Sequence, residues 1–295
     1  MPITPHGIIP AMVTPFTTDD RVNEPALRRL TRHLIAGGAH GLFAMGSQGE
    51  FWACSAEEKR RVWEIVVDEA RGRVPVYAGT AAVTTRECVA LTQLAEKSGV
   101  DAVSVLTPFF VSPGEDELFE HYRAIAAATR LPVILYSNPA RTGVRISTRL
   151  LARLAALENI VGIKDSSGDL ETTTEYMRVA PPGFGVLMGR DTLIFAGLVC
   201  GAQGAIAATA NVVPALVVSI YERFHAGDLA GAKRAQDELA PLRLAFSWGT
   251  FPVVIKEALD LMGLEGGPAR APVGPLPEAK RAELREVLRR LGVVQ

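Results

Sequence analysis

Residues 159–169 have the sequence Asn-Ile-Val-Gly-Ile-Lys-Asp-Ser-Ser-Gly-Asp, in which a short apolar run ends at Lys164 and a polar stretch follows. A short β-branched run bounded by turn residues is typical of a strand buried on both faces. We therefore expect Lys164 to lie at the carboxyl end of a buried strand, with its amine facing a cleft. Partial desolvation there would disfavour the ammonium form, and a neutral amine is the nucleophile that forms a Schiff base with a ketone.

The other lysines lie in different sequence contexts. Lys59, Lys97, Lys233 and Lys280 are in charged stretches typical of solvated helix faces, and Lys256 is in an amphipathic run. A lysine that closes a strand is usually an exposed end residue, so position alone does not assign catalysis to Lys164. Because no other lysine ends a predicted buried strand, a catalytic role for this residue is favoured.

The composition is that of an ordinary globular protein. Of its 295 residues, 48% are hydrophobic and 21% are charged, and the formal net charge is −1. These values give no reason to expect nucleic acid or an anionic membrane as a partner. The cysteines at positions 54, 88 and 200 are scattered, which favours a reducing compartment over a disulfide framework. No signal peptide or membrane span is recognisable, so we expect a cytoplasmic protein.

Short β-rich runs alternate with helical patterns along the first two thirds of the chain. The strand candidates are residues 8–13, 41–45, 74–78, 102–106, 132–136, 160–164, 186–188 and 205–207. Helical patterns include residues 24–36, a helix beginning at Ser55 with a capping box to Glu58, and residues 85–98, 115–129 and 147–157. Strict alternation predicts a parallel sheet, and eight such units in about 210 residues predict a closed (β/α)8 TIM barrel.

After residue 211 the pattern changes to helices without strands. They are expected at residues 214–225, 229–244, 251–262 and 278–291, with a loop rich in glycine and proline at 266–277. We therefore predict a barrel of residues 1–211 and a C-terminal helical extension of residues 212–295. The competing architecture is a doubly wound open sheet, which usually has a Gly-rich phosphate loop after its first strand. Residues 14–17, Thr-Pro-Phe-Thr, contain no such loop.

Catalytic residues of such barrels lie at the carboxyl ends of the strands and in the loops that follow. Residues 46–50, Gly-Ser-Gln-Gly-Glu, follow the second strand and offer N–H groups and polar side chains that suit a carboxylate, although they equally fit a plain turn. Tyr136 ends the fifth strand as Lys164 ends the sixth. Since adjacent strands lie ~4.8 Å apart, the phenol and the amine can converge in the barrel mouth. A phenol there can move protons while a carbinolamine forms and collapses.

Two further loops carry candidate binding residues. Arg141, in the loop after the fifth strand, offers a bidentate fork for a carboxylate, although it is equally a surface cation. Residues 189–191, Gly-Arg-Asp, follow the seventh strand and are placed to contact a polar substrate tail.

Four segments resemble one known family. They are Gly-Ile-Ile-Pro-Ala-Met-Val-Thr-Pro-Phe at 7–16, Gly-Ser-Gln-Gly-Glu at 46–50, Leu-Tyr-Ser-Asn-Pro-Ala-Arg-Thr-Gly at 135–143 and Gly-Ile-Lys-Asp-Ser-Ser-Gly-Asp at 162–169. The chain resembles, over essentially its whole length, the dihydrodipicolinate synthase / N-acetylneuraminate lyase superfamily of pyruvate-dependent class I aldolases.

This resemblance implies a (β/α)8 barrel that assembles as a homotetramer, a dimer of dimers. It implies that Lys164 forms the Schiff base with pyruvate, that Tyr136 is the neighbouring acid/base residue and that Ser47 takes part in a proton relay. It further places Gln48 at the pyruvate carboxylate, and the backbone near Gly189 and Ile206 around the pocket. No metal or organic cofactor is expected.

The sequence departs from the family pattern at two places that affect the substrate. Many relatives supply a tyrosine to the relay from the loop after the fourth strand, across the dimer interface, but residues 107–110 are Thr-Pro-Phe-Phe, and Phe110 has no hydroxyl. Threonine is usual where Gln48 stands, and the larger amide narrows the pocket. Arg141 does match the synthases, in which the equivalent arginine meets a substrate carboxylate.

These observations leave three functional hypotheses. The first is a lyase that cleaves or forms a carbon–carbon bond of pyruvate or a related 2-oxo acid, with an acceptor other than that of dihydrodipicolinate synthase. The second is an aldolase or dehydratase (hydro-lyase) for 2-keto-3-deoxy sugar acids, working through the same imine. The third is a 2-oxo-acid binder without turnover. The sequence does not identify the acceptor aldehyde.

Overall fold

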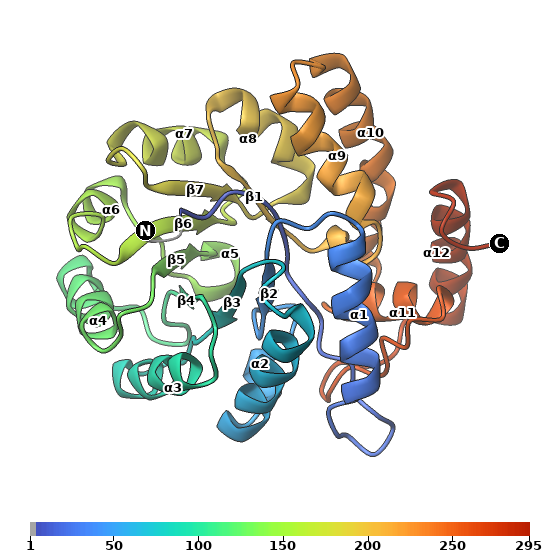
Figure 1. Cartoon of the computed structure of the whole chain (residues 1–295), viewed down its shortest axis with the longest axis horizontal. Coiled ribbons are helices and arrows are strands. Elements are labelled where there is room, and N and C mark those ends of the chain that lie inside the picture. The colour runs from blue at the N-terminus through green and yellow to red at the C-terminus, as the bar shows by residue number, and fades with distance from the viewer. Residues whose placement is uncertain (1–3) are drawn as a thin grey trace.

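Eight parallel strands form one sheet in the computed structural model, which describes residues 4–295 (Figure 1). Their bounds are β1 Gly7–Pro10, β2 Leu42–Ala44, β3 Val76–Gly79, β4 Ala102–Leu106, β5 Val133–Ser137, β6 Ile160–Asp165, β7 Gly185–Met188 and β8 Gly204–Ala207. The strands pair in the order β1-β8-β7-β6-β5-β4-β3-β2, and a parallel bridge between Ala11 and Phe43 joins the two end strands. The predicted barrel is thus confirmed, and the open doubly wound sheet is excluded.

Helices surround the barrel; α1 to α8 connect successive strands, and α9 follows the last strand. Their bounds are α1 Glu24–Ala36, α2 Ala56–Ala70, α3 Thr85–Lys97, α4 Glu115–Ala127, α5 Pro139–Thr142, α6 Thr148–Leu154, α7 Leu170–Val179, α8 Ile194–Cys200 and α9 Pro214–His225. The predicted capping box is present at the start of α2, where Ser55 accepts from the N–H of Glu58 and the Glu58 carboxylate accepts from the N–H of Ser55. The sequence does not predict the single turn α5, which carries Arg141.

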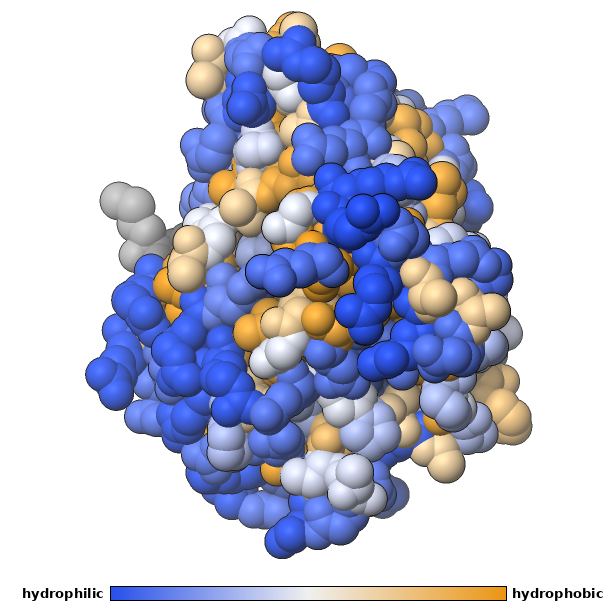
Figure 2. Space-filling view, turned by 90° about the vertical axis from the view of Figure 1, so that its right-hand side faces the viewer, coloured by the Kyte–Doolittle hydropathy of each residue, from blue (hydrophilic) through white to orange (hydrophobic). Residues whose placement is uncertain are grey.

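Three helices follow α9: α10 Leu229–Ala245, α11 Val253–Leu261 and α12 Glu278–Arg290. In Figure 1, α10 lies beside α9, whereas α12 stands at the edge of the molecule. Figure 2 shows this edge of the molecule, where hydrophilic residues cover most of the surface and apolar residues are exposed in small separate groups. None of the helices within residues 4–295 is long and apolar enough to cross a membrane. The division of the chain at residue 211 stays a proposal.

The barrel interior is filled with side chains. Six large residues from different strands or strand ends meet there with at most 2% exposure: Ile9, Phe43, Tyr77, Ile134, Leu187 and Ile206. A second buried cluster lies above them at the carboxyl ends of the strands and includes Phe51, Leu106 and Tyr136. The packed interior closes the floor of any site at this end, so ligands reach it only from the barrel mouth.

Candidate active site

Lys164 and Tyr136 are direct neighbours in the sheet, since β5 and β6 pair in the register that joins these two residues. The Lys164 Nζ lies 4.1 Å from the centroid of the Tyr136 ring and 5.3 Å from that of Phe43. Lys164 is only 5% exposed, and within residues 4–295 it forms no ion pair. The amine therefore lies against two aromatic rings at the carboxyl ends of the strands, and no carboxylate within residues 4–295 pairs with it.

The Tyr136 hydroxyl is placed for proton transfer. It lies 3.5 Å from the Ser47 Oγ, at the outer limit of a hydrogen bond, and accepts a hydrogen bond of 3.2 Å from the Asn138 side chain. Burial by itself raises the pKa of Tyr136, but the charge of Lys164 and the hydrogen bonds of Ser47 and Asn138 outweigh it, so the pKa is lower than that of an ordinary tyrosine. A lowered pKa makes this phenol a better proton carrier at neutral pH.

Ser47 and Gln48 lie on a tight loop whose ends have unusual backbone conformations. Met45 and Glu50 both adopt a left-handed conformation, with φ of 58° and 57°. The Thr14 hydroxyl donates to the Gly49 carbonyl at 2.8 Å and fixes the middle of the loop. A side chain at Gly79 would lie 2.1 Å from the Met45 carbonyl oxygen, so only glycine allows β3 to approach so closely. Ser47 and Gln48 are thereby held half-buried in the cavity wall.

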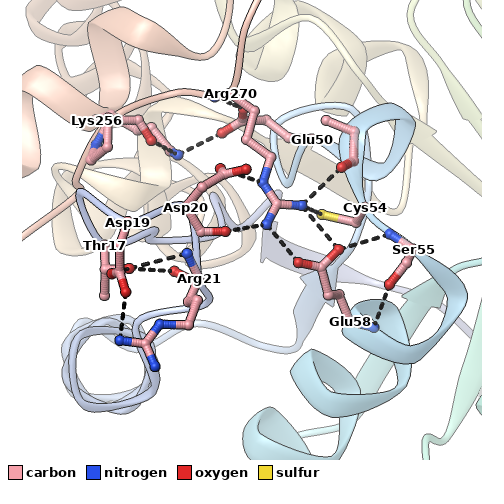
Figure 3. Close-up of polar contacts among 12 residues, drawn as sticks. Thr17, Asp19, Asp20, Arg21, Glu50, Cys54, Ser55, Glu58, Lys256 and Arg270 are labelled. Atoms are coloured by element: carbon pink, nitrogen blue, oxygen red, sulfur yellow. Dashed lines mark hydrogen bonds and ion pairs between the residues drawn. The ribbon is translucent and has the colours of Figure 1, made fainter.

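A buried ionic network fastens this loop to the C-terminal segment (Figure 3). The Glu50 carboxylate pairs with the Lys256 Nζ at 2.5 Å and accepts from the backbone N–H of Arg270 at 2.8 Å. The Arg270 guanidinium bridges Asp20 and Glu58 and also donates to the carbonyl of Ala53. Hydrogen bonding to Arg270 lowers the pKa of Glu58 to about 2. We infer that this network positions Ser47 and Gln48 through their neighbour Glu50.

The burial of Lys59 corrects the sequence interpretation, and Lys256 is buried as well. The charged stretch around Lys59 predicts a solvated helix face, but this residue is 6% exposed, and Lys256 is 1% exposed. The Lys59 amine lies 5.9 Å from the centroid of the Phe51 ring. Lys164 therefore differs from the other lysines not by burial alone but by its place in the barrel mouth beside Tyr136.

The predicted site residues line one cavity of about 360 Å³ at the carboxyl ends of the strands. The structure brings together here all the residues singled out from the sequence, namely Lys164, Tyr136, Ser47, Gln48, Arg141, Gly189 and Ile206. A Cβ at Gly189 would lie 2.0 Å from the Ser166 Oγ and 2.8 Å from the backbone oxygen of Asp165, so a larger residue there would displace the strand end that follows Lys164. The volume falls within the usual range for small-molecule sites and exceeds the space that pyruvate, with six heavy atoms, would fill.

Sequence reasoning misses several lining residues. Asn138 and Ser166 directly follow the strands that end near Tyr136 and Lys164, so their place next to those residues is a usable signal. Arg243, Phe246, Ser247 and Phe251 come from the segment that includes the end of α10, and they form part of the cavity wall. No local motif marks them, because tertiary packing alone brings this segment to the barrel mouth.

The loop after β4 places its two phenylalanines in different surroundings. Phe110 is 97% exposed and has a positive φ of 73°. Phe109 instead packs on Phe51, with ring centroids 5.8 Å apart. Neither ring lines the cavity of its own chain.

Within residues 4–295, no three His, Cys, Asp or Glu side chains converge to form a potential metal site.

Comparison with known proteins identifies the family. The model of the dihydrodipicolinate synthetase family matches residues 4–291. The 4-hydroxy-tetrahydrodipicolinate synthase of Methanopyrus kandleri is 40% identical over 98% of this chain and 97% of its own. An uncharacterized DapA-like lyase of Halobacterium salinarum is 38% identical over 99% of this chain and 96% of its own.

Solved structures agree with this assignment. Dihydrodipicolinate synthase DapA-2 of Bacillus anthracis superposes with a TM-score of 0.95 at 33% identity, covering 98% of this chain and 99% of its own. YagE, a prophage protein of the dihydrodipicolinic acid synthase family from E. coli K12, was solved in complex with pyruvate. It superposes with a TM-score of 0.94 at 34% identity, covering 98% of this chain and 99% of its own. The chain therefore belongs to the dihydrodipicolinate synthetase family, and it is an enzyme of the carbon–carbon lyase (aldolase) type.

Proposed function

We propose that the enzyme is a Schiff-base-forming lyase that acts on pyruvate or a related 2-oxo acid, with Lys164 as the nucleophile. The observation that carries this proposal is the buried Lys164 amine, which lies 4.1 Å from the Tyr136 ring centroid at the floor of an open cavity. The pyruvate complex of the related YagE supports the choice of ligand.

The proposed chemistry begins with attack of the neutral Lys164 amine on the carbonyl carbon of the 2-oxo acid. Tyr136 gives a proton to the carbonyl oxygen, which leaves as water when the carbinolamine collapses to the imine. The protonated imine then withdraws electrons from the next carbon, so a bond beyond that carbon can form or break.

The other site residues assist these steps. Ser47 passes protons to and from Tyr136, and Gln48 binds the carboxylate of the 2-oxo acid. Gly189 and Ile206 leave room for its methyl or methylene group.

For the second substrate, we propose an aldehyde other than aspartate semialdehyde, so that the natural substrate is a 2-keto-3-deoxy sugar acid. In many relatives a tyrosine completes the proton relay, and Phe110 supplies no hydroxyl. A sugar acid carries its own hydroxyl near the reacting carbon, which would replace part of the missing relay. Cleavage to pyruvate would identify an aldolase, whereas loss of water without pyruvate would identify a dehydratase of the same imine chemistry.

We further propose that the enzyme is a homotetramer. The apolar side chains of Phe110 and Val111 are 97% and 46% exposed, as expected for a loop that a second subunit covers. A cytoplasmic location stays a prediction.

Reductive trapping tests the central step. The enzyme is incubated with pyruvate and borohydride, and the intact mass is measured. We expect one reduced pyruvate adduct in the wild type and none in Lys164→Ala. The matched control is Lys59→Met, which removes another buried lysine and should leave the adduct intact. An unmodified wild-type protein would refute the proposed imine.

A further inference from the structure

Three arginines line the active-site cavity: Arg141 on α5, Arg190 in the loop after β7 and Arg243 near the end of α10. Within residues 4–295, none of the three forms an ion pair with a carboxylate. Other arginines of the chain behave differently, since Arg28 and Arg270, for example, each bind two or more acidic side chains. The cavity arginines thus have hydrogen-bond donors that the protein itself does not use.

Each of these guanidinium groups is nevertheless held in place. The Arg190 Nε donates to the Ser166 carbonyl at 3.1 Å, and its terminal NH2 groups form no hydrogen bond with the residues that the structure describes. Arg243 lies over the ring of Phe246, 5.1 Å from the centroid, and Arg141 lies over Phe251 at 4.2 Å. Contacts with the face of an aromatic ring orient a guanidinium without occupying its in-plane N–H donors. Such an arrangement leaves a fork available for a planar or tetrahedral anion.

The charge of the cavity wall contrasts with that of the chain. The whole protein is nearly neutral, with a formal net charge of −1. In the cavity, however, Lys164 and the three arginines face a single acidic side chain, Asp191. One oxygen of that carboxylate is already occupied, because the backbone N–H and the hydroxyl of Thr209 both donate to it at 2.6 Å. The cavity wall therefore carries more positive than negative side chains, and Asp191 is the one acidic side chain that faces them.

One carboxylate of the substrate does not account for this excess of positive charge. In the proposed function, the carboxylate next to the oxo group lies with Gln48 near Lys164, which is 5% exposed at the cavity floor. Arg190 and Arg243 are half-buried, and they come from the loop after β7 and from α10, not from the strand end that carries Lys164. They are thus available to the opposite end of a longer substrate.

We propose that Arg190 and Arg243 form a subsite for a second anionic group, a carboxylate or a phosphate ester, at the end of the substrate remote from its oxo carbon. This inference rests on the proposed function and narrows its substrate class to 2-keto-3-deoxy acids with an acidic tail. Arginine suits this role because its fork pairs with carboxylate and phosphate oxygens through two hydrogen bonds.

A series of three substrates with one carbon skeleton tests the subsite. 2-Keto-3-deoxygluconate ends in a neutral CH2OH group, 2-keto-3-deoxyglucarate ends in a carboxylate, and 2-keto-3-deoxy-6-phosphogluconate ends in a phosphate ester. Consumption of each acid is followed by NMR, which detects both cleavage and dehydration. We expect kcat/KM for at least one acidic tail to exceed that for the neutral tail by about 10- to 100-fold, as is usual for charge-assisted hydrogen bonds. The tail that is preferred identifies the anion.

Variants assign the effect to the two arginines. Arg190→Gln and Arg243→Gln should each lower the ratio of acidic-tail to neutral-tail kcat/KM by about tenfold or more. Arg243→Lys should lower this ratio less, because it retains the charge and loses only the fork. The matched control is Arg234→Gln, which removes an exposed arginine of the same helix and should keep the wild-type ratio. A wild-type ratio near one, or variants that slow all three substrates equally, would overturn the subsite.

Direct binding separates this inference from the proposed function. Lys164→Ala forms no imine, so calorimetric titration of the three acids into this variant measures recognition of the tail alone. Tighter binding of an acidic tail to Lys164→Ala supports the subsite even where borohydride trapping of the wild type fails. If trapping succeeds and the three acids bind Lys164→Ala equally, the proposed function stands and the subsite is refuted.

Discussion

The Lys256 Nζ lies 2.5 Å from the Glu50 Oε1, and the two side chains are only 1% and 0% exposed. Burial lowers the pKa of Lys256, and the neighbouring Glu50 carboxylate opposes that shift. The pair joins α11 to the loop that carries Ser47 and Gln48. Since each charge compensates the other away from water, neither can be removed alone without leaving a buried, unpaired ion.

Lys256→Ala should therefore lower the free energy of unfolding by about 3–5 kcal/mol, as measured by chemical denaturation. The matched control is Lys233→Ala, which breaks the exposed pair with Asp237 on α10 and should cost about 0–1 kcal/mol. The double variant Lys256→Met/Glu50→Met should lose less free energy of unfolding than the single variants Lys256→Met and Glu50→Met lose together. Equal losses of unfolding free energy for Lys256→Ala and Lys233→Ala would show that the buried pair does not hold α11 to the loop of Ser47 and Gln48.

The phenol of Tyr136 should be the first in the protein to ionise as the pH rises. Its pKa is lowered despite burial, chiefly by the charge of Lys164, whereas burial raises the pKa of Tyr77, Tyr122, Tyr176 and Tyr221. Ultraviolet titration should show one phenolate forming below the ordinary value of about 10. This first step should vanish in Tyr136→Phe and persist in Tyr221→Phe. Its persistence in Tyr136→Phe would assign the early titration to another group.

Loss of the same hydroxyl should slow catalysis. Tyr136→Phe keeps the ring beside Lys164 and removes only the proton carrier, so imine formation or turnover should fall by about 10²-fold or more. Stopped-flow measurement with pyruvate separates the two steps. A rate within about threefold of the wild type would mean that another group, or water, moves the proton.

Arg141→Ala should mainly weaken the binding of a carboxylate-bearing substrate. A charge-assisted hydrogen bond contributes about 1.5–3 kcal/mol, so KM should rise by about tenfold or more while imine formation with pyruvate persists. The control is Arg145→Ala, an exposed arginine on the chain just beyond α5. If the kinetics of the best 2-oxo-acid substrate were unchanged in Arg141→Ala, Arg141 would not be a substrate-binding residue.

The enzyme should be a poor dihydrodipicolinate synthase. In the proposed relay, Phe110 stands where many relatives have a tyrosine, so protons would have to pass through water or another side chain. We expect kcat/KM for a 2-keto-3-deoxy acid to exceed that for condensation of pyruvate with aspartate semialdehyde. Phe110→Tyr should raise the synthase activity if the exposed loop reaches a neighbouring subunit. Wild-type synthase turnover of about 10⁴ M⁻¹s⁻¹ or more would contradict this prediction.

Local sequence signals are sufficient for most of the fold. The predicted bounds of α1, α9 and β4 agree with the structure, because these elements have clear periodicity or a β-branched run with turn residues on both sides. Lys164 and Tyr136 can be paired from the sequence alone, because strands that follow each other in a barrel are neighbours and both residues end a predicted strand. Ser55 and Glu58 likewise form a motif within four residues.

The remaining features depend on contacts between distant segments. The burial of Lys256 depends on its ion pair with Glu50, which lies about two hundred residues earlier. Arg243 lies on a helix that has no strand next to it in sequence, so the rule that sites follow strand ends does not find it. The exposure of Phe110 depends on a left-handed turn for which a phenylalanine gives no signal.

The Arg270 side chain donates a hydrogen bond to Asp20, a residue 250 positions earlier, and this contact has a consequence for synthesis of the enzyme. A nascent chain that has left the ribosome up to residue 211 already contains all eight strands together with Lys164, Tyr136 and Ser47. It still lacks the wall formed by Arg243, Phe246 and Phe251, and the partners that hold Glu50 in place. Since domains fold as they emerge, the barrel can form first, but the finished pocket becomes available only with the last tenth of the chain. An incomplete chain of residues 1–211 would therefore carry the Lys164 amine in a cavity that still lacks part of its wall.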